Sequence, residues 1–363
     1  MVGIITFHRA INYGAVLQVY ALQKSIEKMD INVKVLDYVS ESMKSEYDPF
    51  IRSKNMPFFL KLLYLPLRVS RINKFKLFID RHINITKPLE TADDLIGLNK
   101  EFSAFITGSD QVWNYIYTNF DKAFFLDFAD TSTKKYSYAA SFGFSEIPDN
   151  LQDEYYDLLK DFDRILVREW QGANIVKNLL KADPDKVLDP TLLLDKFEWS
   201  KLKNTSNPIE NGYILLYGLI DLSELKNFAE KLSEKTGLKI IWTRAFVEQK
   251  IKNCVKKYTS GPEEWLTLFL NASYIVTNSF HGTAFAINFN KNFFTGYLPP
   301  PAKNNSRLEN ILEMFNLQNR LIIDGDNTDM LKDIDYTEVN KILENEREKS
   351  LNHLKMMVKQ CDS

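Results

Sequence analysis

The chain has 363 residues, of which 45% are hydrophobic and 26% are charged, a composition typical of a globular protein with about two domains. Its 46 Lys and Arg residues nearly balance its 48 Asp and Glu residues, so the net charge of −2 gives no overall basic field that would attract nucleic acid. Two cysteines exclude a disulfide framework and a cysteine-rich zinc site, and four histidines limit the choice of a catalytic imidazole.

No stretch of the sequence reaches the roughly 20 apolar residues that a transmembrane helix requires. The apolar run at residues 2–7 is too short for the core of a signal peptide, and no basic region precedes it. We therefore expect a cytoplasmic protein with reduced thiols.

The first half of the chain alternates between strand-like and helix-like runs. Strands are predicted at residues 3–7, 33–38, 102–107, 135–139 and 164–167, with helical patterns at 16–26 and 150–159. A strand, helix and strand in succession build parallel sheets with right-handed crossovers.

A shift in composition between residues 189 and 211 indicates a linker, and the alternation begins again after it. Strands are predicted at 213–217, 238–243, 274–278 and 292–297, and helices at 222–236, 262–271, 281–288 and 336–363. We predict two Rossmann-like, doubly wound α/β domains, at 1–195 and 211–335, that face each other across a cleft. The charged helix at 336–363 is expected to pack back on the N-terminal domain.

Residues 51–82 form a basic arm in the N-terminal domain, with eight Lys and Arg residues against a single acid, Asp80. Aromatic and aliphatic residues are interleaved with these charges. Such a segment could contact an anionic membrane surface or a phosphorylated acceptor, or it could be a solvated helical arm packed on the domain. Pro57 and Pro66 are expected to break any long continuous helix here.

Ligands of open α/β sheets bind beyond the carboxyl ends of the strands, and the first polar segment at such an end is residues 8–14. It contains His8, Arg9, Asn12 and Tyr13, followed by a glycine just before a predicted helix. Free backbone N–H groups in such a turn can bind an anion, although a plain helix-entry turn would have the same composition. The segment contains neither a dinucleotide fingerprint nor a Walker A loop.

The second segment, residues 108–114, follows a predicted strand with the sequence Gly-Ser-Asp-Gln-Val-Trp-Asn. Ser109, Asp110 and Gln111 place a hydroxyl, a carboxylate and a carboxamide within one turn. Ser109 or Asp110 could instead cap a helix.

The third segment, residues 279–283, joins a strand to a helix whose first turn contains His281. Ser279, Gly282 and Thr283 are small, so a ligand could approach the helix N-terminus closely, and the helix dipole would favour an anion there. A histidine at this position could act as a general acid or base, or it could be a structural residue of the core.

Arg168, directly after a predicted strand, and Arg307, ahead of an apolar helical run, are the basic candidates. Arginine suits bidentate recognition of phosphate or carboxylate, while an ordinary surface ion pair is the alternative for each. The sequence contains no convincing metal-ligand spacing and no Gly-x-Ser-x-Gly nucleophile motif.

Taken together, these segments resemble the polysaccharide pyruvyl transferase family. The resemblance rests on an ordered series of motifs from the first residues to beyond position 280, at residues 3–8, 12–18, 107–114, 138–143, 167–169, 188–191, 261–265 and 277–283. Each motif is weak by itself, but the ordered set is specific and covers nearly the whole chain.

The resemblance implies a GT-B-like fold and the transfer of a pyruvyl group from phosphoenolpyruvate to a sugar diol, which gives a pyruvate ketal in bacterial surface polysaccharide biosynthesis. His281 is the first choice for the acid or base of this reaction, Asp110 is the second, and Arg168 would bind an anionic group of the donor. Phosphoenolpyruvate would be a co-substrate, with no further cofactor and no metal. The remaining residues expected to bind substrate are His8, Arg9, Asn12, Tyr13, Ser109, Gln111, Ser279, Gly282, Thr283 and Arg307.

The chain departs from the family pattern at Ser279, where similar enzymes carry an arginine two residues before the histidine. A basic contact to the donor is therefore absent or is supplied elsewhere, with Arg307, Arg9 and His8 as the candidates.

The expected acceptor is a lipid-linked or nucleotide-linked sugar, and the basic arm would then meet its phosphate or the inner face of the plasma membrane. Two other functions remain open at this stage. One is a GT-B glycosyltransferase that uses a nucleotide sugar, and the other is a carbohydrate-binding or scaffold protein without catalytic activity.

Overall fold

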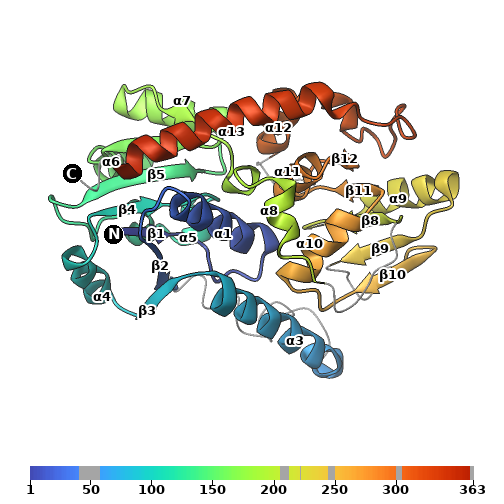
Figure 1. Ribbon diagram of the computed structural model, residues 1–363, viewed down its shortest axis with the longest axis horizontal. Coiled ribbons are helices and arrows are strands. Elements are labelled where there is room, and N and C mark those ends of the chain that lie inside the picture. The colour runs from blue at the N-terminus through green and yellow to red at the C-terminus, as the bar shows by residue number, and fades with distance from the viewer. Residues whose placement is uncertain (41–57, 205–211, 221, 244–249, 300–304, 360–363) are drawn as a thin grey trace. The chain divides into compact units, whose positions relative to one another are not determined.

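The computed structural model describes residues 1–40, 58–204, 212–220, 222–243, 250–299 and 305–359 (Figure 1). Its internal contacts divide the chain into two units. Unit 1 consists of Met1–Lys61, Phe75–Leu193 and Glu346–Ser363, and unit 2 of Leu62–Lys74 and Leu194–Asn345. Most of the polar stretch at 204–208 that indicated a linker lies outside the described residues, as does the start of the basic arm at 51–57.

Unit 1 contains a seven-stranded parallel sheet with the strand order β3-β2-β1-β4-β5-β6-β7. The strands are β1 (Val2–Ile5), β2 (Val33–Tyr38), β3 (Ile85–Leu89), β4 (Ala104–Thr107), β5 (Lys134–Ala140), β6 (Arg164–Val167) and β7 (Asp185–Lys186). The chain adds strands outward from β1 to β3 and then returns to β4 beside β1. This reversal places the topological switch point, where ligands of such sheets bind, between β1 and β4.

The helices of unit 1 follow its strands and cover the sheet. They are α1 (Tyr13–Glu27), α4 (Ala92–Gly97), α5 (Tyr115–Thr118), α6 (Gln152–Leu159) and α7 (Trp170–Leu180), with single 3₁₀ turns η2 (Leu98–Lys100), η3 (Lys122–Phe125), η4 (Asp149–Leu151) and η5 (Pro190–Leu192). Helix α1 is apolar on nearly all sides and most of its residues are buried, as expected for a helix enclosed by a core.

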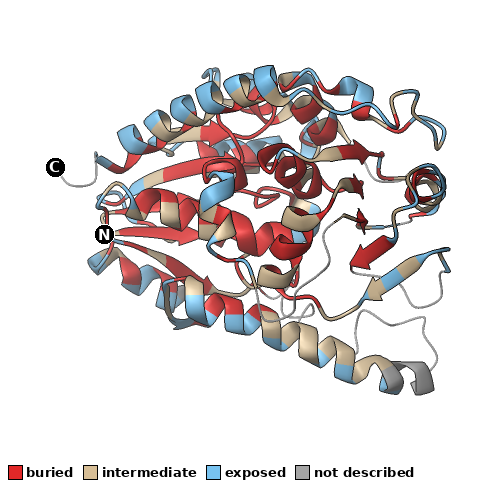
Figure 2. Ribbon diagram, turned by 45° about the vertical axis from the view of Figure 1, so that its right-hand side comes forward, coloured by how far each residue is buried: buried red, intermediate tan, exposed pale blue. Residues whose placement is uncertain are grey.

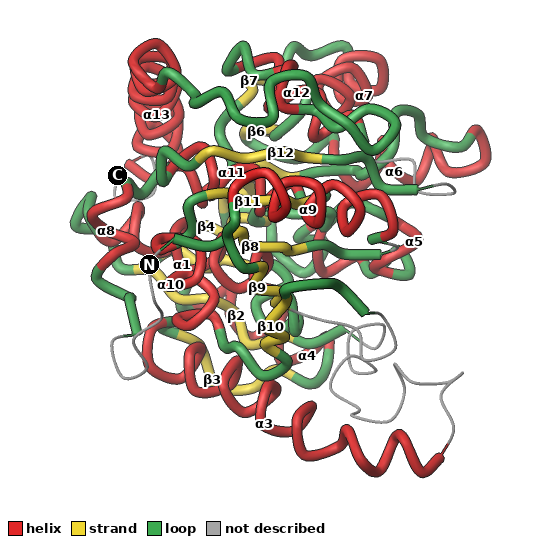
Figure 3. Tube along the Cα trace, turned by 90° about the vertical axis from the view of Figure 1, so that its right-hand side faces the viewer, coloured by secondary structure: helices red, strands yellow, loops and turns green. Residues whose placement is uncertain are grey.

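Unit 2 contains a five-stranded parallel sheet with the order β10-β9-β8-β11-β12, which Figure 3 shows from bottom to top. The strands are β8 (Ile214–Tyr217), β9 (Ile240–Thr243), β10 (Cys254–Lys257), β11 (Tyr274–Thr277) and β12 (Asn292–Thr295). The helices are α8 (Lys196–Ser200), α9 (Ser223–Thr236), α10 (Pro262–Asn271), α11 (Phe280–Asn288) and α12 (Ser306–Met314), with the 3₁₀ turn η6 (Gln318–Arg320). Helix α9 packs on β8, β9 and β11, and α11 packs on β11, β12 and α12.

Two long helices contain residues of both units. Helix α13 (Tyr336–Lys359) begins in unit 2 and ends in unit 1. Within unit 1, Arg347 Nε donates to the carbonyl of Leu192 at 2.7 Å and the backbone N–H of Leu188 donates to Ser350 Oγ at 2.9 Å. These contacts attach the end of α13 to the segment that follows β7.

Helix α3 (Phe58–His82) continues through Pro66, so the expected break at this proline is wrong. Proline removes the hydrogen bond to the carbonyl four residues earlier, which is that of Leu62. The Leu62 side chain is exposed, and at an exposed turn of a helix water can replace the missing donor. Figure 2 shows that α3 and α13 carry exposed residues along their length, whereas the strands of both sheets are mostly buried.

The prediction of two doubly wound α/β halves is confirmed by the two parallel sheets. The predicted ranges coincide with β2, β6 and α10, and most other elements differ by one or two residues at each end. Strands β3, β7 and β10 were not predicted. They lie at the edges of the sheets and carry polar or exposed residues, so they lack the continuous apolar run of a strand buried on both faces.

Candidate functional site

The turns after β1 and β4, on the two sides of the switch point, are tied together by Thr6. Its hydroxyl donates to the backbone carbonyl of Ser109 at 2.9 Å and accepts from the Gln18 amide at 2.9 Å. Thr6 is buried. The polar residues that follow the two strands are therefore held at one edge of the sheet.

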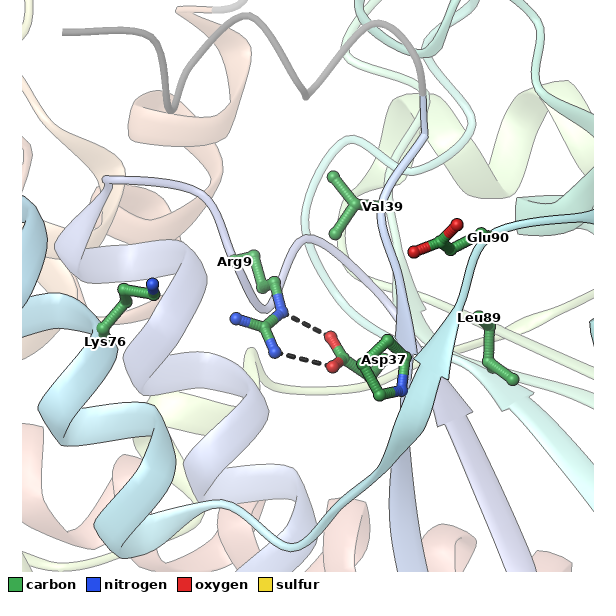
Figure 4. Close-up of a pocket in the computed structure, with 7 residues that line it drawn as sticks. Arg9, Asp37, Val39, Lys76, Leu89 and Glu90 are labelled. Carbon is green, nitrogen blue, oxygen red and sulfur yellow. Dashed lines mark hydrogen bonds and ion pairs between the residues drawn. The ribbon is translucent and has the colours of Figure 1, made fainter.

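His8 and Arg9, in the turn after β1, both contact Asp37 near the end of β2. The His8 imidazole lies 3.0 Å from Asp37 Oδ1 through Nε2 and 3.2 Å from the Thr6 carbonyl through Nδ1. The Arg9 guanidinium forms a bidentate pair with the same carboxylate, through Nε and through Nη2 at 2.6 Å from Oδ2 (Figure 4). A carboxylate and a carbonyl only accept hydrogen bonds, so each ring nitrogen of His8 faces an acceptor.

The partners of Asp37 determine its ionisation. Burial by itself would raise the pKa of this carboxyl group, but the hydrogen bonds from His8 and Arg9 outweigh it and hold the pKa well below the ordinary value of 3.8. Asp37 therefore stays ionised in the folded protein, and its charge is balanced inside the turn.

A second cluster of charges surrounds Arg168, which follows β6. Arg168 Nη1 donates to Asp189 Oδ2 at 2.9 Å and to Ser109 Oγ at 3.3 Å, while Nε donates to Glu169 Oε2 at 3.2 Å. Ser109 Oγ donates to Asp189 at 2.8 Å, and Ser141 Oγ donates to Glu169. Because these groups are buried, the cluster fixes the ends of β4, β5 and β6 relative to one another.

The ionisation of Arg168 reflects the same neighbours. Burial by itself would lower the pKa of the guanidinium, but the carboxylates of Glu169, Asp189 and Asp110 outweigh it and raise the pKa above its ordinary value. Arg168 is therefore a permanent cation with carboxylate partners inside unit 1.

Asp110 has a positive φ at this edge. Its φ of +78° lies in the left-handed region, which costs a residue other than glycine about 1–3 kcal/mol. The Asp110 carbonyl accepts from the N–H groups of Val112 and Ser141, and its Oδ1 accepts from the N–H of Gln111 at 2.9 Å. The residue is mostly buried and keeps 9% of its surface exposed. Such strain marks functional sites in many proteins.

Gly143, after β5, allows the backbone to pass close to Gln111. Its φ is +72°, and a Cβ atom placed on it would lie 1.9 Å from Gln111 Oε1. That oxygen accepts from Asn114 Nδ2 at 2.9 Å. Glycine is therefore required here, and it keeps the Gln111 carboxamide in place.

Asn12 and Tyr13 begin helix α1. The Asn12 side chain caps the helix by accepting from the N–H of Gly14 at 3.0 Å. Tyr13 is buried, and its ring packs against Phe75 with a centroid distance of 5.1 Å. Asn12 and Tyr13 thus both stabilise the start of α1 in the fold, and their role in binding substrate stays a prediction.

In unit 2, the N-terminus of α11 lies beyond the carboxyl end of β11. Ser279 caps the helix by accepting from the N–H of Gly282 at 3.3 Å. A Cβ atom on Gly282 would lie 2.4 Å from Thr277 Oγ1 and 3.2 Å from the Tyr217 ring, so the first turn approaches β8 and β11 closely. Thr283 Oγ1 donates to Thr295 Oγ1 at 3.2 Å, which joins the helix to β12.

His281 lies in this first turn and is mostly buried, with its ring beside that of Phe280 at a centroid distance of 5.3 Å. Asn278, at the end of β11, accepts from the N–H of Leu219 at 2.9 Å through Oδ1. Its Nδ2 has no hydrogen-bond partner among the residues that the structure describes, although only 1% of the residue is exposed. A buried amide donor without a partner is costly unless water or a ligand satisfies it.

Arg307 lies in the first turn of α12, and residues 300–304 before this helix are outside the described residues. Helices α11 and α12 follow β11 and β12, which are neighbours in the sheet, so both helices start at its carboxyl edge. Arg307 is mostly buried and belongs to the same unit as His281.

The candidates from the sequence thus separate into two groups. Unit 1 contains His8, Arg9, Asn12, Tyr13, Ser109, Asp110, Gln111 and Arg168, and unit 2 contains Ser279, His281, Gly282, Thr283 and Arg307. Sequence reasoning missed the acids that pair with the basic candidates, although each of them lies near the end of a strand or in the segment after it. These acids are Asp37, Glu169 and Asp189.

Within the described ranges, no three or more His, Cys, Asp or Glu residues are grouped so that they could hold a metal ion. None of the described helices is both long enough and apolar enough to span a membrane.

Replacing Asp37 with Asn should destabilise the protein by about 3 kcal/mol at pH 7, because the buried His8 and the partly buried Arg9 then face a neutral amide. The pKa of Asp37 is lower in the folded state, so its stabilisation is complete above the unfolded value and is lost as the pH falls below about 4. Urea unfolding at pH 7, 5, 4 and 3 should therefore show the wild type and the variant converging in acid. An equal difference at pH 7 and pH 3 would contradict this account.

Replacing Asp189 with Asn should cost about 3–5 kcal/mol of unfolding free energy, because Arg168 then lacks one of its two carboxylate partners. The matched control is Asp183→Asn, in which the carboxylate pairs with Lys177 on the surface and its side chain is 82% exposed. That substitution should change stability by less than about 1 kcal/mol. Similar urea midpoints for the two variants would show that the cluster around Arg168 contributes little.

The family model described as "Polysaccharide pyruvyl transferase" matches residues 12–295. No curated protein matches the chain.

Solved structures with the same fold include UDP-GlcNAc 2-epimerase from Methanocaldococcus jannaschii, with a TM-score of 0.56 and 13% identity over 94% of this chain and 91% of that one. A putative UDP-N-acetylglucosamine 2-epimerase from Listeria monocytogenes gives a TM-score of 0.54 and 10% identity over 97% and 94%. At such identities the likeness concerns the fold alone, which is GT-B-like. Because the family model covers most of the chain, this protein belongs to the polysaccharide pyruvyl transferase family and is a transferase.

Proposed function

We propose that the protein transfers a pyruvyl group from phosphoenolpyruvate to two hydroxyl groups of a sugar and forms a cyclic pyruvate ketal in the synthesis of a bacterial surface polysaccharide. The observation that carries the proposal is the carboxyl edge of unit 2. There, the first turn of α11 brings together His281, small residues and backbone N–H groups. A donor with a phosphate and a carboxylate requires such a site for anions.

The reaction balances without a redox partner. A proton is added to the methylene carbon of phosphoenolpyruvate, which makes C2 electrophilic, and a sugar hydroxyl then forms the first C–O bond. The bond from C2 to the phosphate oxygen breaks, and the second hydroxyl closes the ring. One hydroxyl proton replaces the proton given to the methylene carbon, and the other leaves with inorganic phosphate.

In this proposal, His281 is the acid that protonates the methylene carbon. The N-terminus of a nine-residue helix stabilises a neighbouring anion through the backbone N–H groups of its first turn and through its dipole. The Nδ2 group of Asn278 is a further donor at the same edge, because it is buried and has no partner among the described residues.

Arg307 is the best candidate for the cation that similar enzymes place two residues before the histidine. It belongs to the same unit as His281, and its helix starts at the same edge of the sheet. His8 and Arg9 belong to unit 1 and contact Asp37, so they are less suited to the donor site in unit 2. Arg168 similarly holds two carboxylates inside unit 1.

Asp110 is the proposed base that accepts a proton from the attacking sugar hydroxyl. Its exposed part, its strained backbone and its position beside the switch point support this role. The acceptor would be a lipid-linked or nucleotide-linked sugar that is reached from the cytoplasm, with the protein either free or bound to the inner face of the membrane.

The function is tested by incubating the protein with phosphoenolpyruvate and glycosides of galactose, mannose and N-acetylmannosamine. We expect release of inorganic phosphate that depends on the acceptor, and mass spectrometry should detect the pyruvate ketal. His281→Gln should lower kcat by about 10²–10⁴-fold, the usual contribution of a general acid. His353→Gln, in α13, is the matched control and should leave kcat unchanged.

Two results would contradict the proposal. If His281→Gln keeps the full rate, the acid has been assigned to the wrong residue. If no acceptor supports phosphate release, and UDP or GDP raises the melting temperature while phosphoenolpyruvate does not, the protein is a glycosyltransferase instead.

A further inference from the structure

Unit 1 contains a pocket of about 390 Å³ beyond the carboxyl ends of β2 and β3, which the proposed donor site does not use. Val39, Pro88 and Leu89 form an apolar wall, and charged side chains form the rest of the lining. Small-molecule sites usually combine such an apolar surface with a few polar groups, in volumes of about 300–1,000 Å³. This pocket is at the lower end of that range, which suits one sugar ring and an attached group.

The positive and negative side chains of the pocket lie on different sides of it. Figure 4 shows Arg9 between Lys76 of α3 and Asp37, while Glu90 lies at the end of β3 on the other side of Asp37. One side of the pocket is therefore cationic, and a carboxylate lies on the other side.

The cationic side is available to a ligand. Lys76 is exposed and has no ion pair with any residue in the described part of the chain. Arg9 pairs with Asp37 through Nε and Nη2, and its side chain is still 19% exposed. Asp37 itself is buried and saturated by His8 and Arg9, so it cannot attract a cationic ligand.

We propose that this pocket binds the acceptor through a phosphate on the anomeric carbon of its sugar. Lys76 and Arg9 contact the phosphate, Glu90 accepts hydrogen bonds from sugar hydroxyls, and Val39, Pro88 and Leu89 pack against the apolar face of the ring. This inference rests on the proposed function and names the chemical class of its acceptor. Lipid-linked and nucleotide-linked sugars share this phosphate, and the two sources are separated by experiment.

A single ligand has to match the cationic side and the carboxylate side of the pocket. A free anion such as phosphoenolpyruvate would gain from Lys76 but would be repelled by Glu90. A neutral sugar would leave the ammonium of Lys76 without a partner. A sugar phosphate is anionic at one end and carries hydroxyl donors at the other, so it satisfies both sides.

Binding is measured by isothermal titration calorimetry on the full chain, without turnover. The probes are the 1-phosphates of galactose, mannose and N-acetylmannosamine, the corresponding methyl glycosides, inorganic pyrophosphate and phosphoenolpyruvate. Lys76→Met should weaken the binding of at least one sugar 1-phosphate by about tenfold or more, since a charge-assisted contact is lost. The affinities for the methyl glycosides and for phosphoenolpyruvate should not change.

Three further variants sharpen the test. Lys76→Arg should restore most of the affinity for sugar 1-phosphates, because it keeps the charge. Glu90→Gln should weaken the sugar 1-phosphates but not pyrophosphate, because only the sugars carry hydroxyl donors. Lys100→Met, which removes an exposed lysine elsewhere in unit 1, should change none of the affinities.

The source of the phosphate is identified with two larger probes that carry the sugar bound best. One is its UDP derivative, and the other is its farnesyl diphosphate derivative in detergent micelles. Of these two probes, the one that binds more tightly and loses affinity in Lys76→Met identifies the source. The UDP derivative stands for a nucleotide-linked acceptor, and the farnesyl diphosphate derivative stands for a lipid-linked acceptor.

The inference is overturned if no sugar 1-phosphate binds, or if Lys76→Met leaves every Kd within about twofold of the wild type. Its failure can be distinguished from a failure of the proposed function. If a sugar 1-phosphate binds in a way that depends on Lys76 but no pyruvyl transfer occurs, the binding site is supported and the proposed reaction is contradicted. If pyruvyl transfer occurs and the KM for the acceptor is unchanged in Lys76→Met, the proposed reaction is supported and the binding site is contradicted.

Discussion

The buried guanidinium of Arg168 determines how the carboxyl edge of unit 1 is built. Removing a charge from water is costly unless hydrogen-bonded partners of opposite charge replace the solvent. Asp189 and Glu169 supply these partners, and Ser109 bonds both to Arg168 and to Asp189. The turn after β4 is therefore fixed at Ser109, and Asp110 is held next to it with a positive φ.

Because a buried charge requires partners, the two units offer different kinds of groups to ligands. In unit 1, most of the basic candidates are already paired with acids, so the groups left for ligands are those at the margin, such as Lys76 and Asp110. In unit 2, the edge at α11 is built from hydroxyl, amide and backbone N–H groups around His281. A helix N-terminus stabilises an anion without requiring a buried ion pair.

Most of the fold could be predicted because its signals are local. Strands of a parallel sheet are rich in apolar residues, and β2 and β6 were predicted from their apolar residues. The edge strands β3, β7 and β10 carry polar or exposed residues and have no such run. The path of α3 through Pro66 could not be predicted either, because it depends on the exposure of that turn in the folded protein.

The sequence by itself determined the fold class, the family resemblance and the segments that carry the polar candidates, since these follow from short motifs and from the period of apolar residues. Only the tertiary structure decided which of these residues are paired. His8 and Asp37 are 29 positions apart, and Ser109 and Asp189 are 80 positions apart. Such partners meet because of the order of strands in the sheet, and that order depends on non-local packing rather than on any local pattern.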